Sequence, residues 1–228
     1  MTEGDLVGAT IVFDLDGTLV DTAPDLVRAL NQTLDLEGLP NVPTSAVRRI
    51  VGQGARVMIE RAAALANAHF APARLEQLTD AFVHFYKADI AGASTLFPGA
   101  LAAMDALTDA GAALAVCTNK RTALSRALLE ALTIDHRFAA IVGADAVSNR
   151  KPHPDHFIET VARAGGDAAR ALMVGDSTAD VNAAKGAGAP VVVVSFGYND
   201  AAPNEMGADA VIAHFAELEA IARGRLAM

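Results

Sequence analysis

The sequence predicts an α/β fold in which a parallel sheet carries helices on both of its faces. Six short runs are continuously apolar, as strands covered on both faces are, and stretches with helical spacing separate most of them. Strands that alternate with helices form parallel sheets with right-handed crossovers. We expect the strands in six ranges: 9–14, 113–118, 139–145, 171–176, 190–196 and 208–213.

The connecting segments predict the domain organisation. Helices are expected at 98–111, 121–132, 154–166 and 179–188. The alternation stops after the first strand, because residues 23–96 consist of successive stretches with helical spacing, bounded by proline or glycine. We therefore expect a Rossmann-like core of residues 1–22 and 97–228, with an all-helical cap, residues 23–96, inserted after the first strand. A cap in that position would overhang the ends of the strands and could close over them.

Composition narrows the class of partner. The chain has 228 residues, of which 52% are hydrophobic and 20% charged, as expected of an ordered globular protein. Its formal net charge of -9 argues against a nucleic-acid or anionic-membrane surface, since both favour basic patches. No signal peptide or membrane-spanning run is visible, and the single cysteine, Cys117, excludes an internal disulfide. We expect a cytoplasmic protein with a small-molecule partner, and its oligomeric state is left open.

Polar residues follow several of the predicted strands. In open parallel sheets, ligands bind beyond the carboxyl ends of the strands, so these side chains can converge on one edge. The residues concerned are Asp14, Asp16, Thr118, Asn119, Asp145, Asp176 and Asp180.

The segment DLDGTLVDT, residues 14–22, places two carboxylates in one turn. Asp14 ends the first strand, Asp16 lies two residues further on, and Gly17 allows the backbone to bend. Two adjacent like charges are unfavourable unless a cation or a proton lies between them. The pair therefore indicates metal or acid–base chemistry.

This segment resembles the first motif, DxDGTxxDT, of the haloacid dehalogenase superfamily of phosphohydrolases. The resemblance implies that Asp14 is the nucleophile that attacks phosphorus and forms an aspartyl-phosphate. It implies that Asp16 is the general acid that protonates the leaving alkoxide, and then the base that activates water.

Two further motifs follow in the order that the family requires. CTNK, residues 117–120, resembles the second motif, so that Thr118, Asn119 and nearby backbone amides would hold the phosphate oxygens. RKPHP, residues 150–154, supplies Lys151, which the resemblance implies pairs with the phosphate and steadies Asp14.

The last motif implies a metal site. VGDSTADVNAAKGAG, residues 174–188, resembles the family's GDSxxDxxxAxxAG, so Asp176 would bind a metal directly, and Asp180 would bind it through water or orient Lys151. Together with Asp14 and the backbone carbonyl of Asp16, these residues offer the hard oxygen ligands that Mg²⁺ prefers. Three carboxylates against one lysine would repel a dianionic phosphate, and Mg²⁺ would neutralise them.

Less specific stretches resemble the members of the superfamily that hydrolyse 2-phosphoglycolate: RRIVGQGARVMIERAA, LFPGALAAMDALTDAGAALAVCTNK, RKPHP and SFGYN. The function implied is a Mg²⁺-dependent phosphomonoesterase of carbohydrate metabolism. In the cap, Gly52, Gln53 and Gly54 precede a helical run whose first amides would be free to bind a small carboxylate. Arg56 could add a charge-assisted contact.

Other functions stay open at this stage. Another small-molecule phosphatase, or a phosphotransferase related to β-phosphoglucomutase, would use the same core residues. A non-catalytic protein that binds phosphate ligands would keep the fold without the chemistry. Turnover of phosphate esters in the presence of Mg²⁺ separates the enzymes from the binding protein.

Overall fold

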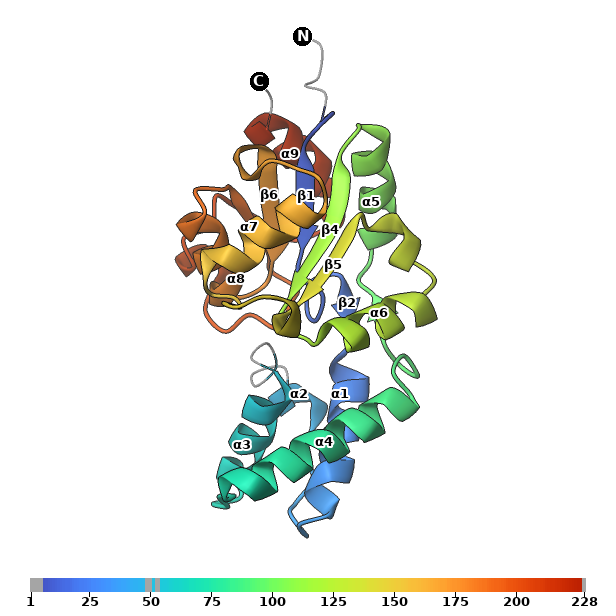
Figure 1. Ribbon diagram of the computed structural model, residues 1–228, viewed down its shortest axis with the longest axis vertical. Coiled ribbons are helices and arrows are strands. Elements are labelled where there is room, and N and C mark those ends of the chain that lie inside the picture. Colours follow the sequence, from blue (N-terminus) through green and yellow to red (C-terminus); the bar gives the residue numbers. More distant parts are fainter. Residues whose placement is uncertain (1–5, 48–50, 52–53, 227–228) are drawn as a thin grey trace.

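The computed structural model describes residues 6–47, 51 and 54–226, with a sheet at one end and a group of helices at the other (Figure 1). All neighbouring strands of the main sheet are parallel, in the order β5-β4-β1-β6-β7-β8. Each lies within a predicted range, which confirms the parallel α/β fold. The strands are β1 (Thr10–Phe13), β4 (Ala113–Thr118), β5 (Ala140–Gly143), β6 (Ala171–Gly175), β7 (Val191–Val194) and β8 (Ala210–Ile212).

Helices cover both faces of this sheet. Successive strand residues point to opposite sides, so apolar strands present an apolar surface on each face for helices to cover. Ile11 and Phe13 belong to one buried cluster and Val12 to the other. The first cluster includes α5 (Ala100–Asp109), α6 (Thr122–Ala131) and α9 (Leu218–Leu226), and the second includes α7 (Pro154–Arg163) and α8 (Thr178–Gly186). The sequence analysis did not predict α9, whose nine residues include two arginines and a glycine.

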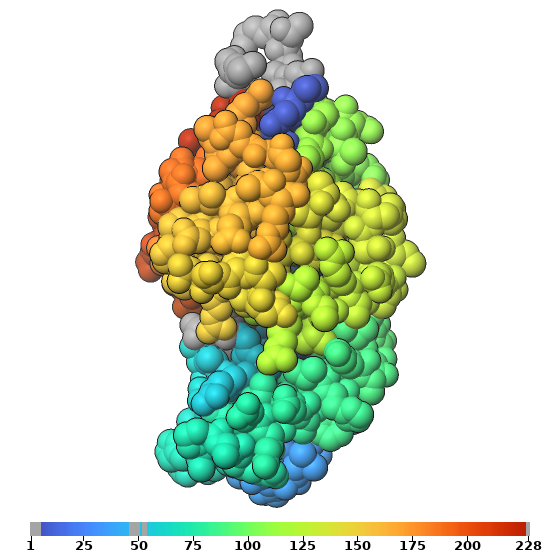
Figure 2. All heavy atoms as spheres, in the orientation of Figure 1, coloured from blue at the N-terminus to red at the C-terminus, as the bar shows by residue number. Residues whose placement is uncertain are grey.

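A helical module follows the first strand, and of its four helices in the described residues the first, third and fourth pack around a hydrophobic cluster. The four helices are α1 (Ala23–Asp35), α2 (Thr44–Val47), α3 (Ala55–Leu65) and α4 (Pro72–Ala88). Ile59, Leu78 and Phe82 are buried in this cluster, which Leu124 of α6 joins from the sheet side. Figure 2 shows the module in contact with the end of the sheet core.

Two segments connect the module to the core, and hydrogen bonds join them to each other. β2 (Val20–Asp21) and β3 (Thr95–Leu96) form a short antiparallel pair that the sequence analysis did not predict. Asp25, which is buried in α1, accepts hydrogen bonds from the backbone N–H groups of Ala93 and Ser94 and from the Ser94 hydroxyl. The two crossing points of the chain are therefore held side by side.

The remaining regular elements are single 3₁₀ turns. They are η1 (Asp135–Arg137), η2 (Ala144–Ala146), η3 (Ala168–Arg170), η4 (Pro203–Glu205) and η5 (Phe215–Glu217). Among the helices that the structure describes, none combines the length and the apolar character needed to cross a membrane. The cytoplasmic location stays a prediction.

Candidate active site

Lys151 lies at the centre of a buried ionic network at the carboxyl ends of β1 and β4. Its Nζ is 2.9 Å from Asp14 Oδ1 and 2.6 Å from Asp180 Oδ1, and it donates a hydrogen bond to the carbonyl of Cys117 at 2.7 Å. Burial raises the pKa of Asp14 to about 6, because the effect of Lys151, which favours the charged form, only partly offsets desolvation. The sequence motif thus brings the predicted nucleophile and the predicted lysine into direct contact.

His156 holds the backbone of Lys151 in place. The N–H of Lys151 donates to His156 Nδ1 at 3.2 Å, and His156 Nε2 lies 3.2 Å from the carbonyl of Val142. Burial lowers the pKa of His156 to about 4, with Lys151 adding to the effect, so the ring is neutral at pH 7. The sequence analysis gave His156 no role, because its partners are backbone groups that no side-chain pattern reveals.

Three buried carboxylates form a cluster that could hold a metal ion. One oxygen each from Asp14, Asp176 and Asp180 lies within 4.8 Å of the other two. Burial, together with the neighbouring charges of Asp14 and Asp180, raises the pKa of Asp176 well above its usual range. Three carboxylates lie beside one lysine, so the cluster carries excess negative charge that a divalent cation would offset. The donors are all oxygen, as Mg²⁺ requires, so the residues fit the expected metal.

The two oxygens of Asp180 have different partners. While Oδ1 contacts Lys151, Oδ2 accepts hydrogen bonds from the N–H of Asp176 at 3.2 Å and from the N–H and hydroxyl of Ser177 at 3.0 and 2.6 Å. These contacts form a capping box at the start of α8. Asp180 therefore fixes the position of Lys151 relative to the loop that carries Asp176.

Tyr198 connects the acidic cluster to the start of the helical module. Its N–H donates to Asp176 Oδ2 at 2.6 Å. Its hydroxyl donates to Asp21 Oδ1 and accepts from the N–H of Ala23, both at 2.7 Å. The hydroxyl thus satisfies one of the free N–H groups at the beginning of α1. The SFGYN stretch contains this residue, but the partners of its hydroxyl lie 175 and 177 residues away in sequence.

Gly17 should not tolerate a side chain. It has a φ of +87°, and an added Cβ would lie 2.3 Å from Asp176 Oδ2 and 2.7 Å from Tyr198 Cδ2. We expect Gly17→Ala to cost roughly 1–3 kcal/mol of stability and to raise the Mg²⁺ concentration needed for activity, since Asp176 must move. Thermal unfolding and Mg²⁺ titration measure both effects.

Gly38→Ala is the matched control for this substitution. Gly38 also has a positive φ, +63°, but an added Cβ would meet nothing within 4 Å. This variant should carry the backbone cost alone and keep the Mg²⁺ dependence of the wild type. Equal Mg²⁺ requirements in the two variants would contradict the predicted contact between Gly17 and the acidic cluster.

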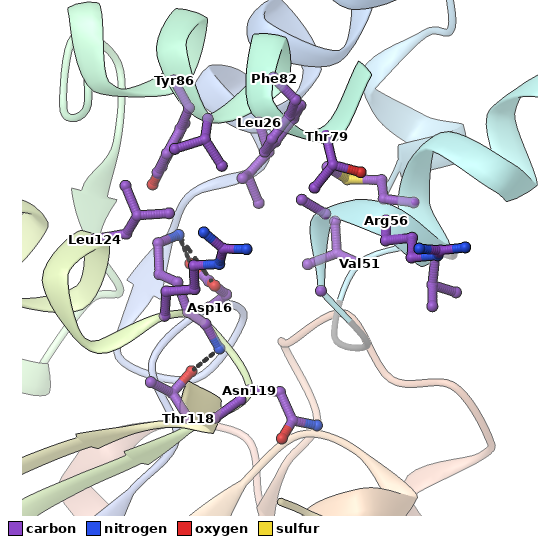
Figure 3. Close-up of a pocket in the computed structure, with 18 of the residues that line it drawn as sticks. Asp16, Leu26, Val51, Arg56, Thr79, Phe82, Tyr86, Thr118, Asn119 and Leu124 are labelled. Atoms are coloured by element: carbon purple, nitrogen blue, oxygen red, sulfur yellow. Dashed lines mark hydrogen bonds and ion pairs between the residues drawn. The ribbon is translucent and has the colours of Figure 1, made fainter. Parts of the chain in front are cut away.

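Asp16 forms an ion pair with Lys120 (Figure 3). Lys120 Nζ lies 2.9 Å from Oδ1 and 3.2 Å from Oδ2 of Asp16. The same ammonium group is 4.3 Å from the centre of the Tyr86 ring, which α4 supplies from the helical module. Lys120 ends the CTNK motif, and no role for its side chain was predicted from the sequence.

Thr118 and Asn119 lie beside these residues at the end of β4. The Thr118 hydroxyl oxygen accepts from the N–H of Lys120 at 3.2 Å, which leaves the hydroxyl hydrogen available to a ligand. Asn119 Nδ2 donates to the carbonyl of Lys151 at 3.1 Å. The Asn119 contact links the CTNK loop to the backbone of Lys151.

A cavity of about 340 Å³ lies between the sheet core and the helical module. Its core side includes Asp14, Asp16, Thr118, Asn119 and Lys120. Its module side is largely apolar, and Figure 3 shows the side chains of Leu26, Phe82 and Tyr86 lying opposite Asp16. A second cavity, of about 880 Å³, reaches the acidic cluster, with Lys151, Asp176 and Tyr198 in its wall.

The predicted cap residues have different positions. Gly52 and Gln53 lie outside the described residues. Gly54, with a φ of +91°, precedes the first residue of α3 and lines the smaller cavity, so the start of α3 faces that space. Arg56 also lines it, but its side chain is 53% exposed and its Nε lies 3.6 Å from Glu60 Oε1. The structure therefore brings the start of α3, more than the Arg56 guanidinium, to the cavity.

Comparison with known proteins identifies the family. Residues 11–194 match the family model of the haloacid dehalogenase-like hydrolases. The chain belongs to this family. This hydrolase is 50% identical to a phosphoglycolate phosphatase of Mesorhizobium japonicum, over 90% of each chain. It is 49% identical to a phosphoglycolate phosphatase of Caulobacter vibrioides, over 94% of this chain and 90% of the relative.

Solved structures show the same arrangement. A predicted phosphoglycolate phosphatase from Haemophilus somnus superposes on this hydrolase with a TM-score of 0.87 and 32% identity, over 95% of this chain and 98% of that one. CbbY from Rhodobacter sphaeroides, solved in complex with phosphate, superposes with a TM-score of 0.79 and 28% identity, over 92% and 96% of the two chains.

Proposed function

We propose that this hydrolase is a Mg²⁺-dependent phosphoglycolate phosphatase, which cleaves 2-phosphoglycolate to glycolate and phosphate. The observation that carries the chemistry is the buried carboxylate of Asp14 in contact with Lys151 beside Asp176. The substrate is proposed from the relatives, which share about half of their residues with this chain over nine-tenths of its length.

The proposed reaction has two steps, both at Asp14. In the first, a carboxylate oxygen of Asp14 attacks phosphorus, the bond between phosphorus and the glycolate oxygen breaks, and Asp16 gives that oxygen a proton. In the second, Asp16 takes a proton from water as the water oxygen attacks phosphorus, which releases phosphate and restores Asp14. Thr118, Asn119 and Lys151 would hold the phosphate oxygens during both steps.

The acidic cluster would hold the metal in this mechanism. We assign the ligands to Asp14, Asp176 and the backbone carbonyl of Asp16, as the family resemblance implies. A bound Mg²⁺ would offset the negative charge that the carboxylates and the phosphate share. Asp180 Oδ1 contacts Lys151 Nζ and its Oδ2 belongs to the capping box of α8, so we assign Asp180 to orienting Lys151.

The helical module would select the substrate. We propose that residues 23–96 form a cap over a core of residues 1–22 and 97–228. The amides at the start of α3, after Gly52, Gln53 and Gly54, would attract the carboxylate of a small substrate, because a helix N-terminus carries partial positive charge. Arg56 would contribute only after leaving Glu60.

Asp16→Asn should lower kcat for 2-phosphoglycolate by about 10²- to 10⁴-fold, because the amide cannot supply a proton to the leaving oxygen. p-Nitrophenyl phosphate has a leaving group that departs without a proton, so its first step should be less affected. Steady-state kinetics on both substrates, with thermal unfolding as a folding control, tests the assignment. Equal losses in the first step for the two substrates would argue against leaving-group protonation.

A panel of phosphate esters tests the proposed function as a whole. With Mg²⁺ present, 2-phosphoglycolate should have a higher kcat/KM than glycerol phosphate, hexose phosphates or p-nitrophenyl phosphate. A preference for hexose phosphates would indicate another phosphatase, and formation of a sugar bisphosphate would indicate a phosphotransferase. A folded, metal-loaded protein that turns over none of these compounds would favour the non-catalytic phosphate-binding protein.

A further inference from the structure

Lys120 is a buried cation at the boundary between the core and the helical module. Its side chain is only 6% exposed, and its Nζ contacts both oxygens of Asp16. Around this pair, Leu26 and Leu124 line the cavity, and the Tyr86 ring lies 4.3 Å from Nζ. A buried ammonium in apolar surroundings needs a counterion, and in this structure Asp16 provides it.

The ion pair places a condition on the chemistry of Asp16. Proton transfer requires Asp16 to lie within hydrogen-bond reach of the leaving oxygen. Both oxygens of Asp16 contact Lys120, so the ion pair holds this carboxylate toward Lys120 at the wall of the cavity. If Asp16 moved away alone, Lys120 would remain buried without a counterion, which is unfavourable. A second anion must therefore take its place on Lys120.

We propose that the carboxylate of the substrate replaces Asp16 as the counterion of Lys120, so that Asp16, once released by a substrate with an anionic tail, takes up a proton from water and can pass it to the leaving oxygen. The inference rests on the proposed function and deepens it. It defines the substrate class as short phosphomonoesters that carry a carboxylate, and it makes Lys120 a residue that couples substrate choice to acid catalysis.

A further observation fits an anion at this position. The buried hydroxyl of Tyr86 has no hydrogen-bond partner of good geometry within the described residues. Burial raises the pKa of Tyr86 to about 12, so this hydroxyl keeps its proton and can donate it in a hydrogen bond to a carboxylate.

The exchange would reject substrates with neutral tails. A methyl or glycerol phosphate brings no anion to Lys120, so Asp16 stays paired and proton transfer is slow. Discrimination of this kind is strong, because the wrong substrate leaves a buried charged group without a partner. The start of α3 and Lys120 would then act on the same carboxylate from two sides of the cavity.

The decisive measurement is the preference for 2-phosphoglycolate over methyl phosphate, expressed as a ratio of kcat/KM values. Lys120→Met should lower kcat/KM for 2-phosphoglycolate by about 100-fold or more. The ratio of the two kcat/KM values should therefore fall toward one. Lys120→Arg, which keeps the charge, should retain part of the preference. Lys185→Met serves as control, because Lys185 forms an exposed ion pair with Asp209 outside the residues that line either cavity.

A second test uses the wild-type enzyme and supplies the phosphate ester and the carboxylate as separate molecules. Formate added to methyl phosphate supplies the missing carboxylate, so the rate should rise to a plateau with formate and not with chloride at equal ionic strength.

A wild type that hydrolyses no phosphate ester would refute the proposed function itself. A wild type that prefers 2-phosphoglycolate, with the preference unchanged in Lys120→Met, would refute the exchange alone. If that variant does not fold, the formate experiment decides, and a rate independent of formate overturns the exchange.

Discussion

Replacement of Asp14 by Asn should abolish turnover and leave the fold intact. The amide keeps the shape of the side chain but lacks the charge that attacks phosphorus, and loss of a nucleophile costs on the order of 10⁴-fold or more in kcat. Stability should not fall at pH 7. Burial disfavours the ionised Asp14, and Asp180 and the carbonyl of Cys117 still hold Lys151 after the substitution.

The covalent step can be tested directly in the same variant. After rapid acid quenching during turnover, mass spectrometry of the wild type should find a phosphoryl group on Asp14, and the Asp14→Asn variant should carry none. Thermal unfolding of both proteins provides the folding control. Wild-type rates in the variant, or a phosphoryl group on another residue, would rule out Asp14 as the nucleophile.

Removal of divalent metal should also stop turnover, and Mg²⁺ should restore it. Without a cation, the carboxylates of the acidic cluster outnumber the lysine that contacts them, so a dianionic phosphate is repelled. Ca²⁺ should inhibit, because it accepts more ligands in looser geometry and could take both oxygens of Asp14. Activity assays in EDTA, followed by addition of each metal at constant ionic strength, measure this. Full activity in excess EDTA would contradict the proposed metal site.

The metal requirement should depend on pH in a defined direction. The pKa of Asp14 in the metal-free protein is raised to about 6, so Asp14 is ionised above that pH and protonated below it. A metal must displace this proton at lower pH, together with any proton on Asp176, whose pKa is also raised, so the Mg²⁺ concentration for half-maximal activity should rise by about tenfold or more per pH unit below 6. Mg²⁺ titrations between pH 5 and 8 test it, and a midpoint that does not change with pH would argue against Asp14 as a ligand.

The predicted sheet and the central site residues depend on local signals. The apolar runs show which segments become strands covered on both faces, because burial of both faces leaves no polar positions. The order of the motifs then indicates that Asp14, Lys151 and Asp176 meet. Asp14 and Asp176 follow the neighbouring strands β1 and β6, whose carboxyl ends lie on one edge. Lys151 joins them through its contact with the carbonyl of Cys117 near the end of β4.

Other features were decided only by tertiary structure. Asp16 and Lys120 are 104 residues apart, and their pairing depends on how β1 and β4 align and on where α4 places Tyr86. His156 contacts the backbone of Lys151 and Val142, and these contacts leave no side-chain pattern. The Tyr198 hydroxyl contacts Asp21 and Ala23, which are distant in sequence. The sequence by itself determined the α/β sheet and the chemical nature of its polar edge, because periodicity and motif spacing are local. Tertiary structure decided which group pairs with each ionisable side chain. The energy of a charge depends on its burial and on its distance from other charges, and both are set only when the chain folds.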